Sequence, residues 1–187
     1  MGPITRSALT RSALRAESLQ RLCAQMGMSA EQQPAKSGML LSIPAVDVEL
    51  ALDVGRMAGD FALNHGLSAI DSYFIAVAVA EAATNISRHG YPQSPGKLEI
   101  WMIERNDGVL VRIIDQGCSI DAAILDAARR YEFPDVFDDL ESASEGGMGL
   151  PLIFKSMDLV HYQATADGNS LLLFKRTSGL SNMIQDR

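Results

Sequence analysis

The sequence is poor in the residues that build disulfide or metal frameworks. It has two cysteines, Cys23 and Cys118, and three histidines among 187 residues. The two cysteines show no spacing typical of metal ligands. Two thiols in a chain of this length fit reduced cysteines in a cytoplasm better than a disulfide-stapled secreted domain. We therefore expect a cytoplasmic protein.

Long apolar runs are also lacking. The longest apolar stretches are far shorter than the ~20 residues that a membrane-spanning helix requires. The N-terminus has no apolar central run of the kind found in secretory signal peptides. Neither a membrane span nor a signal peptide is expected from these patterns.

Positive charge is in deficit. The chain has 16 basic and 23 acidic side chains, which gives a formal net charge of −7. An acidic surface repels phosphate backbones, so direct binding to nucleic acid is not expected. A hydrophobic share of 47% and a charged share of 21% are those of an ordinary globular protein. A chain of this length is most naturally one domain with a substantial core.

The first 38 residues differ in character from the rest. The pentad TRSAL occurs twice in succession, and the polar stretch EQQPAKSG follows as a linker. This predicts an arm over residues 1–38 that is weakly helical or disordered, with loose helical periodicity between Thr10 and Met26. Its arginines leave open a second interpretation, a docking arm for an acidic partner or a second subunit. A compact domain over 39–178 and a C-terminal tail over 179–187 complete the expected organisation.

The compact part alternates between helical and strand patterns. Ser68 is a predicted N-cap with Asp71 three residues later, and the sequence NDG at 106–108 is a hairpin signal. The segment 133–147 is acidic and rich in small residues, which predicts a mobile loop. The whole pattern predicts a two-layer α/β sandwich, with helices on one side of a mixed, largely antiparallel sheet. Strands are expected at 39–45, 97–104, 109–115, 159–165 and 171–175, and helices at 46–64, 68–89, 122–130 and 150–157.

Glu81 and Asn85 interrupt the apolar pattern of the second predicted helix. They are separated by four residues, so both side chains project from one face of that helix. An amide oxygen is a hard ligand suitable for Mg²⁺, and a carboxylate one turn earlier can orient a hydroxyl group or accept its proton. The alternative is a pair of polar side chains that satisfy each other in the core.

Two further stretches accompany this pair. In IIDQG, Asp115 ends an apolar strand and can accept a hydrogen bond from an exocyclic amine such as that of adenine, while Gly117 lets the backbone pass beneath a flat ring. In SEGGMGLPLI, Gly146, Gly147 and Gly149 precede an apolar helix, where backbone N–H groups can face an anion. Taken singly, the first stretch also fits a turn aspartate, and the second a flexible linker.

The order of these three stretches resembles the GHKL ATPase superfamily, whose nucleotide site is built from an N box, a DxG box and a glycine-rich box. The resemblance covers 39–176. The segments EAATNISRHGY, DQGCSID and EGGMGLPLI are most similar to the anti-sigma-factor serine kinases of bacterial partner-switching systems. The resemblance implies the Bergerat ATP-binding fold, which agrees with the predicted sandwich.

The resemblance also implies roles for individual residues. Asn85 would bind the Mg²⁺ that bridges the ATP phosphates, and Glu81 would be the catalytic carboxylate that acts on the acceptor hydroxyl. Asp115 would accept the adenine amine, with Gly117 shaping the pocket floor. The other residues expected to contact ATP come from the glycine-rich box, from the end of the N box and from the last strand, where the family often has a threonine: Gly146, Gly147, Met148, Gly149, Leu150, Arg88, His89 and Ser170.

Some of these expectations have alternatives. Met148 and Leu150 also fit packing within a lid that runs from about 129 to 147, and His89 also fits a structural role. The sequence GNS, in place of a Gly-Thr pair, departs from the family at Ser170. Cys118 lies beside the predicted pocket and is interpreted as an incidental small buried residue rather than a redox site.

The implied activity is that of a serine/threonine protein kinase that uses Mg-ATP to phosphorylate a STAS-domain anti-anti-sigma protein. In the family such a domain also binds a sigma factor as a homodimer, and Arg56 is the candidate contact, or else a solvated surface arginine. The alternative is a non-catalytic nucleotide-binding module that regulates a partner by binding only. A sensor histidine kinase is disfavoured, because none of His65, His89 and His161 precedes the predicted fold.

Overall fold

The computed structural model describes residues 5–8, 38–133 and 147–177. Several predicted features lie outside these residues. They are the helix between Thr10 and Met26, the linker that follows it, Gly146, most of the predicted lid and the tail over 179–187.

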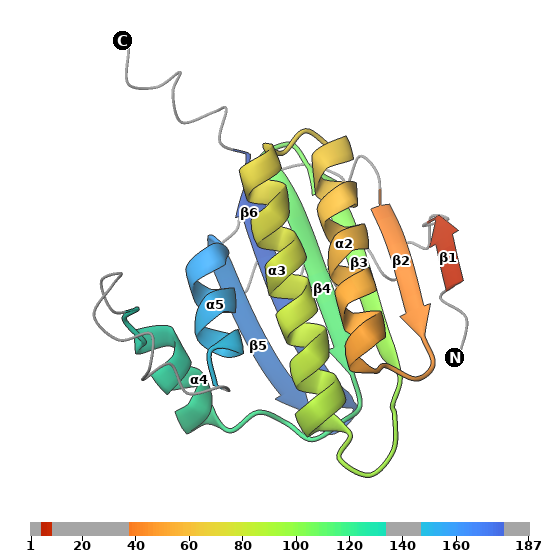
Figure 1. The fold of residues 1–187 in the computed structure, drawn as a ribbon, viewed down its shortest axis with the longest axis vertical. Coiled ribbons are helices and arrows are strands. Elements are labelled where there is room, and N and C mark those ends of the chain that lie inside the picture. Colours follow the sequence, from red (N-terminus) through yellow and green to blue (C-terminus); the bar gives the residue numbers. More distant parts are fainter. Residues whose placement is uncertain (1–4, 9–37, 134–146, 178–187) are drawn as a thin grey trace.

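The described residues contain one six-stranded sheet with the order β1-β2-β3-β4-β6-β5 (Figure 1). All five strand pairings are antiparallel, so this part of the chain lacks the parallel pairing that a mixed sheet would include. The last strand begins at Gly168, three residues before its expected start. The strands are β1 (Thr5–Ala8), β2 (Gly38–Ile43), β3 (Leu98–Arg105), β4 (Gly108–Asp115), β5 (Leu159–Thr165) and β6 (Gly168–Arg176).

Strand β1 differs from the sequence-based expectation of a weakly helical or disordered arm. Residues Thr5–Ala8 pair antiparallel with β2, with Thr5 opposite Ser42 and Ala8 opposite Met39. The pairing supplies backbone hydrogen bonds from a strand more than 30 residues away in the sequence. Local periodicity carries no information about such a partner.

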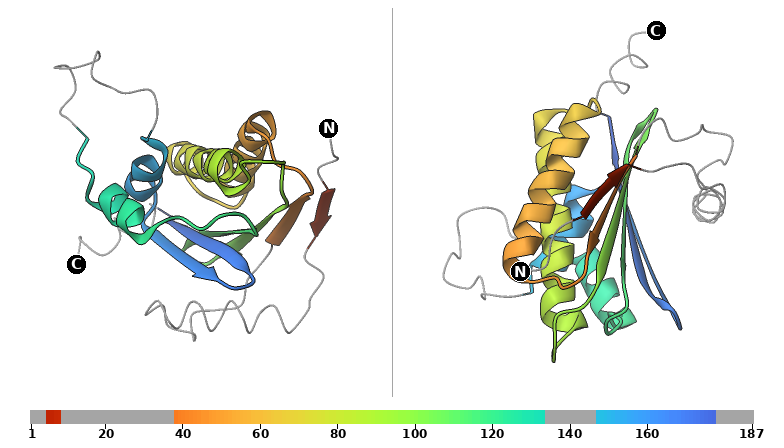
Figure 2. Two further views of the ribbon diagram at one scale, coloured as in Figure 1. Left: turned by 90° about the horizontal axis from the view of Figure 1, so that it is seen from below. Right: turned by 90° about the vertical axis from the view of Figure 1, so that its right-hand side faces the viewer.

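The α-helices of the described residues lie on one face of the sheet (Figure 2). Helix α2 (Val48–Asn64) begins at the N-cap Asp47, whose Oδ1 accepts a hydrogen bond of 2.8 Å from the backbone N–H of Leu50. Helix α3 (Ala69–Asn85) begins at Ser68, whose hydroxyl accepts a 3.1 Å hydrogen bond from the N–H of Asp71 and confirms the predicted cap. Such caps stabilise a helix by about 1 kcal/mol each. The other helices are α4 (Ala122–Arg130) and α5 (Gly149–Ser156).

Helices α2 and α3 pack unusually closely, because α2 presents glycine to α3. A Cβ atom at Gly55 would lie 2.6 Å from the carbonyl oxygen of Ala76, and one at Gly59 would lie 3.0 Å from the Cβ of Ala76. On the sheet side, Ile75 and Val79 are fully buried in the core. Helix α3 is therefore fixed from two sides, and so is the C-terminal half that carries the predicted N box.

A π-helical turn, η1 (Ile86–Gly90), continues α3 without a break. Together they form a 22-residue helix, Ala69–Gly90, which contains an 18-residue window with a mean hydropathy of 1.2. By length and composition this helix can cross a membrane, which the shorter apolar runs in the sequence did not predict. Its packing against α2 and the sheet is that of a core helix, and core helices of globular domains meet the same criterion. The segment is weak evidence for a membrane span.

Candidate functional site

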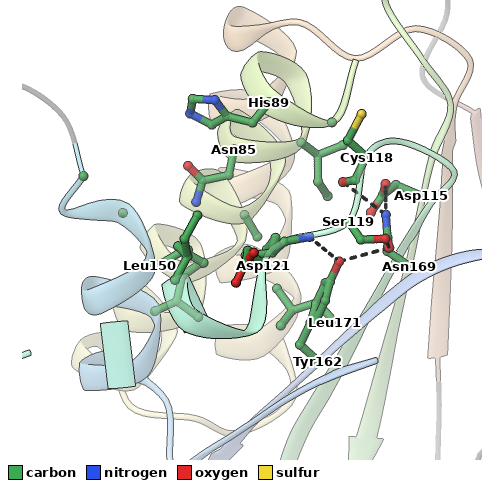
Figure 3. Close-up of a pocket in the computed structure, with 18 residues that line it drawn as sticks. Asn85, His89, Asp115, Cys118, Ser119, Asp121, Leu150, Tyr162, Asn169 and Leu171 are labelled. Carbon is green, nitrogen blue, oxygen red and sulfur yellow. Dashed lines mark hydrogen bonds between the residues drawn. The ribbon is translucent and has the colours of Figure 1, made fainter. Parts of the chain in front are cut away.

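A cavity of about 410 Å³ lies between α3, η1, α5 and the loop that follows β4. This volume falls in the range of small-molecule pockets, roughly 300–1,000 Å³. Asn85 and His89 lie on one side of it, and Asp115 and Asn169 lie on the other (Figure 3). Six residues predicted from the sequence line the cavity, namely Asn85, His89, Asp115, Gly147, Gly149 and Leu150.

Asp115 lines one end of the cavity, where β4 ends, and is 6% exposed. Its Oδ1 accepts hydrogen bonds from the backbone N–H of Gly117 at 2.8 Å and from Nδ2 of Asn169 at 2.9 Å. Oδ2 has no hydrogen-bond partner among the described residues. A buried carboxylate at this position can accept a hydrogen bond from a ligand amine.

Gly117 does not line the cavity, although it was expected to shape the pocket floor. Glycine is needed at this position for a different reason. A Cβ atom there would lie 2.6 Å from the carbonyl oxygen of Gly90. The next residue, Cys118, donates its backbone N–H to that same oxygen at 2.8 Å. Gly117 therefore permits the loop after β4 to contact the π-turn. Cys118 itself is exposed and lines the cavity, so its expected burial is wrong.

Ser170 does not line the cavity, which corrects the expectation that it lies near the adenine. Its Oγ accepts a 3.0 Å hydrogen bond from Nε of Arg112, on the other face of the sheet. Alternate residues of a strand point to opposite faces, and Asn169 consequently faces the cavity. Asn169 is 3% exposed and lies opposite Asp115 in the strand register.

Sequence reasoning missed the polar residues around Asn169. The hydroxyl of Tyr162 donates to Asn169 Oδ1 at 3.0 Å and accepts from the N–H of Ile120 at 2.9 Å. The hydroxyl of Ser119 donates to the same Oδ1 at 2.9 Å. Burial raises the pKa of Tyr162, which keeps its phenol protonated at neutral pH. The one available signal was the position of Asn169 beside the departure already noted at GNS.

Tyr91 is a second missed residue, which joins the segment after the π-turn to the loop after β4. Its hydroxyl donates to the carbonyl oxygen of Lys97 at 2.9 Å and accepts from the N–H of Gln116 at 2.8 Å. Burial raises the pKa of Tyr91, partly opposed by the hydrogen bond from Gln116. Tyr91 thereby holds the segment next to Asp115 in place.

Glu81, Asn85 and Gly149 meet at the other end of the cavity. A Cβ atom at Gly149 would lie 2.5 Å from Oε2 of Glu81 and 3.3 Å from Nδ2 of Asn85. Glu81 does not line the cavity itself but lies directly behind this glycine. Nδ2 of Asn85 is buried and has no hydrogen-bond partner in the described part of the chain. A satisfied polar pair would not leave such an atom unpaired, because an unmet buried donor is costly.

The remaining predicted residues lie around this end. Gly147 is exposed with a φ of +98°, a left-handed conformation that favours glycine. Met148 is the N-cap residue of α5 and is half-buried, whereas Leu150 lines the cavity. Arg88 and His89 are exposed on the π-turn, and only His89 lines the cavity. π-turns of this kind occur frequently at functional sites.

Arg56 lies apart from the cavity. It is exposed on α2 and forms an ion pair with Asp53, one helical turn before it. Exposed pairs of this kind contribute little to stability, about 0–1 kcal/mol. The structure therefore leaves Arg56 available at the surface but gives it no link to the candidate site.

Comparison with known proteins gives consistent matches. The family model described as the histidine kinase-like ATPase domain matches residues 43–175. The chain is also similar to the serine-protein kinase RsbW of Bacillus cereus and to that of Bacillus thuringiensis subsp. konkukian. Each is 31% identical over 118 residues, which cover 63% of this chain and 72% of the relative.

A solved structure, the histidine kinase domain from the Erythrobacter litoralis EL346 blue-light activated histidine kinase, is 16% identical with a TM-score of 0.42. The match covers 95% of this chain and 81% of that chain. A likeness at that TM-score carries no conclusion. The family match and the curated relatives show that the chain belongs to the histidine kinase-like ATPase family and, within it, to the anti-sigma-factor serine kinases.

Proposed function

We propose that this protein is a serine/threonine protein kinase that uses Mg-ATP to phosphorylate a STAS-domain anti-anti-sigma protein. The observation that carries the proposal is the meeting of Glu81, Asn85 and Gly149 at one end of a cavity whose other end holds Asp115. The Glu81 carboxylate, the Asn85 amide and Gly149, which has no side chain, lie together, and the buried Asp115 carboxylate lies at the other end. A kinase that uses ATP needs this separation between the groups that meet the phosphates and the group that binds the base. The curated relatives named as serine-protein kinases support the same activity.

The end of the cavity at Asp115 suits an adenine base. Asp115 offers an unengaged carboxylate oxygen to the exocyclic amine. The side chains of Ile153 and Leu171 are buried or nearly so and supply apolar surface at the same cavity. A few fixed polar groups in a largely apolar cavity are typical of small-molecule sites.

The end of the cavity at Asn85 and Gly149 suits phosphates and a metal ion. No group of three or more His, Cys, Asp or Glu side chains that could hold a metal occurs among the residues described here. Mg²⁺ is commonly held by one or two protein ligands together with substrate phosphates, and the side-chain amide oxygen of Asn85, which lines the cavity, fits that role. When bound, Mg²⁺ neutralises phosphate charge. Gly149 leaves the backbone without a side chain beside Asn85, and Gly147 and His89 also line the cavity. Gly146, the other proposed phosphate contact of the glycine-rich box, lies outside the described residues.

Glu81 is the proposed catalytic carboxylate. In the transfer, the bond between the γ-phosphorus and its bridging oxygen breaks, and a bond to the acceptor serine or threonine oxygen forms. ADP leaves, and the hydroxyl proton passes to Glu81. Phosphoryl transfer depends mainly on positioning and charge neutralisation, so one carboxylate can suffice. The position of Glu81 behind Gly149 supports this role, since its oxygen lies beside the phosphate end of the cavity.

We further propose that the protein acts as an anti-sigma factor in a partner switch, as a homodimer in the cytoplasm. Unphosphorylated substrate would compete with the sigma factor for the kinase, and phosphorylation would release the substrate. The exposed Arg56 on α2 is the proposed sigma contact. Its only described partner is Asp53, an exposed ion pair that another carboxylate can displace at little cost.

A transfer assay tests the kinase proposal. Radiolabelled Mg-ATP is incubated with this protein and each STAS-domain protein of the source organism, with Glu81→Gln as the control variant. We expect label on one serine or threonine of one substrate, and no label with the variant. ATP binding without any label transfer would instead support the non-catalytic nucleotide-binding module.

A further inference from the structure

Asn169 holds the carboxylate of Asp115 from a neighbouring strand. The two residues are opposite each other in the β4–β6 register, although 54 positions separate them in the sequence. Nδ2 of Asn169 donates to Asp115 Oδ1 at 2.9 Å and to the carbonyl oxygen of Gly117 at 3.0 Å. Both acceptors belong to the DxG segment, so one buried amide fixes the side chain and the backbone of that segment together.

The orientation of this amide is set by its other contacts. Its Oδ1 accepts from the hydroxyls of Tyr162 and Ser119, at 3.0 and 2.9 Å. Nδ2 faces the Asp115 carboxylate and the Gly117 carbonyl, which can only accept, so Oδ1 faces Tyr162 and the phenol must donate to it. The phenol oxygen also accepts the N–H of Ile120 at 2.9 Å. A flipped amide would place its oxygen against the Asp115 carboxylate and its N–H groups against the Tyr162 hydroxyl. Donation therefore runs in one direction, from the backbone N–H through the phenol and the amide to the carboxylate (Figure 3).

These hydrogen bonds engage only one of the two carboxylate oxygens of Asp115. Oδ1 is engaged by two N–H groups, from Gly117 and Asn169, whereas Oδ2 has no partner in the described residues. A carboxylate held in this way cannot rotate to exchange its oxygens without losing both bonds. Oδ2 is then an acceptor at a fixed position, and an acceptor discriminates between a ligand amine and a ligand carbonyl.

We infer that Asn169 is a positioning residue for base recognition and that Tyr162 locks the direction of its amide. Together they present Asp115 Oδ2 as a fixed acceptor, which selects a purine with a 6-amino group over one with a 6-oxo group. The inference rests on the proposed ATP site. It assigns to the asparagine of GNS a function that the threonine expected in this strand could supply only through a hydroxyl, which rotates freely.

The test compares the dissociation constants of ATP and ITP, which differ at the 6-position, in titrations of the full chain. In Asn169→Asp, a similarly shaped side chain, an acceptor replaces the donor and two carboxylates face each other. We expect ATP affinity to fall about tenfold or more, since a lost charge-assisted hydrogen bond costs about that factor, and the preference for ATP over ITP to collapse. In Tyr162→Phe the Asn169 Oδ1 loses one of its two hydroxyl donors, so Asn169 holds Asp115 less firmly and the ratio of ATP affinity to ITP affinity should fall several-fold.

Two controls separate base recognition from a general structural effect. Tyr73→Phe removes a phenol hydroxyl from a residue that is 66% exposed on α3, and it should leave the ratio unchanged. Inorganic triphosphate, which lacks a base, should displace a labelled nucleotide equally well from the wild-type protein and from Tyr162→Phe. If Asn169→Asp does not fold, Tyr162→Phe carries the test by itself.

The outcomes distinguish this inference from the proposed function. A wild-type chain that binds neither ATP nor ITP would contradict both this inference and the proposed kinase function. A wild-type chain that prefers ATP, with the same ATP-to-ITP ratio in folded Asn169→Asp and Tyr162→Phe, would overturn the positioning role and leave the kinase proposal standing. A reduced ratio in both variants, with unchanged triphosphate binding, supports the inference.

Discussion

Gly149 of α5 approaches Glu81 of α3 so closely that a Cβ atom on the glycine would lie 2.5 Å from Oε2 of the glutamate. The two residues are 68 positions apart in the sequence and belong to different motifs. Because real Cβ atoms do not come this close to another heavy atom, the missing side chain makes room for the carboxylate. The absence of a side chain at Gly149 therefore allows Glu81 to keep its position, in addition to leaving the backbone accessible to a phosphate.

Gly149→Ala should lower phosphoryl transfer by at least about tenfold, because a displaced carboxylate no longer meets the acceptor hydroxyl. The measurement is the initial rate of label transfer at saturating ATP. Gly66→Ala is the matched control: Gly66 has a φ of +88° and nothing within 4 Å of a Cβ atom. It should cost about 1 kcal/mol of stability through backbone strain without changing the transfer rate. Full activity of Gly149→Ala would contradict the prediction.

Asn85→Ala should weaken Mg-ATP binding by more than about tenfold at little cost in stability. The buried Nδ2 is unpaired, so its removal deletes an unmet donor rather than a hydrogen bond. Affinity is measured by titration with and without Mg²⁺, and stability by thermal unfolding without ligand. The loss of affinity should appear only when Mg²⁺ is present. An unchanged Mg-ATP affinity would refute the metal role.

The close packing of α2 and α3 predicts a graded loss of stability. A Cβ atom at Gly55 would lie 2.6 Å from a backbone oxygen, whereas one at Gly59 would come no closer than 3.0 Å. Gly55→Ala should therefore destabilise the protein by about 1–3 kcal/mol through overpacking, and Gly59→Ala by less. Urea unfolding monitored by circular dichroism measures both. Equal effects, or a larger effect at Gly59, would show that the helices adjust without strain.

The buried phenols predict a loss of stability at alkaline pH. Burial raises the pKa of Tyr91 and of Tyr162 above the ordinary value of 10.0. Above that value the unfolded chain releases these protons while the folded protein retains them. The free energy of unfolding therefore falls as pH rises through about 10, and the contribution is fully present below it.

Phenylalanine at these positions should make the alkaline loss less steep. The comparison is urea unfolding at pH about 8 and about 11 for the wild type, Tyr91→Phe and Tyr162→Phe. The exposed Tyr73 supplies a third variant, Tyr73→Phe, whose pH dependence should match the wild type. If all three variants lose stability as steeply as the wild type, the raised pKa values do not contribute.

Local sequence determined much of the fold. The hydroxyl of Ser68 and the carboxylate of Asp47 cap helices whose apolar spacing already predicts their length. The Ser68 cap, the apolar periodicity and the hairpin signal at 106–108 predicted the two layers and the helices α2, α3, α4 and α5. These features depend on residues within a few positions of one another, which is why they can be read without a structure.

The candidate site was less completely predictable. The N box, the DxG box and the glycine-rich box indicated Asn85, Asp115 and Gly149, all of which line the cavity. Ser170 was assigned in place of its neighbour Asn169, because the side of the sheet that a residue faces depends on strand register. The roles of Glu81, Arg88, His89 and the other proposed ligand contacts stay predictions until nucleotide binding is measured.

The sequence by itself determined which chemical groups this protein carries and the elements that bear them, because caps and periodicity act over one or two helical turns. Only the tertiary structure decided how those groups meet. The hydrogen bond from Asn169 to Asp115 spans 54 residues, and the bonds of Tyr162 and Ser119 converge on the same amide from two other segments. Such contacts arise from strand pairing and helix packing, and no local pattern encodes them.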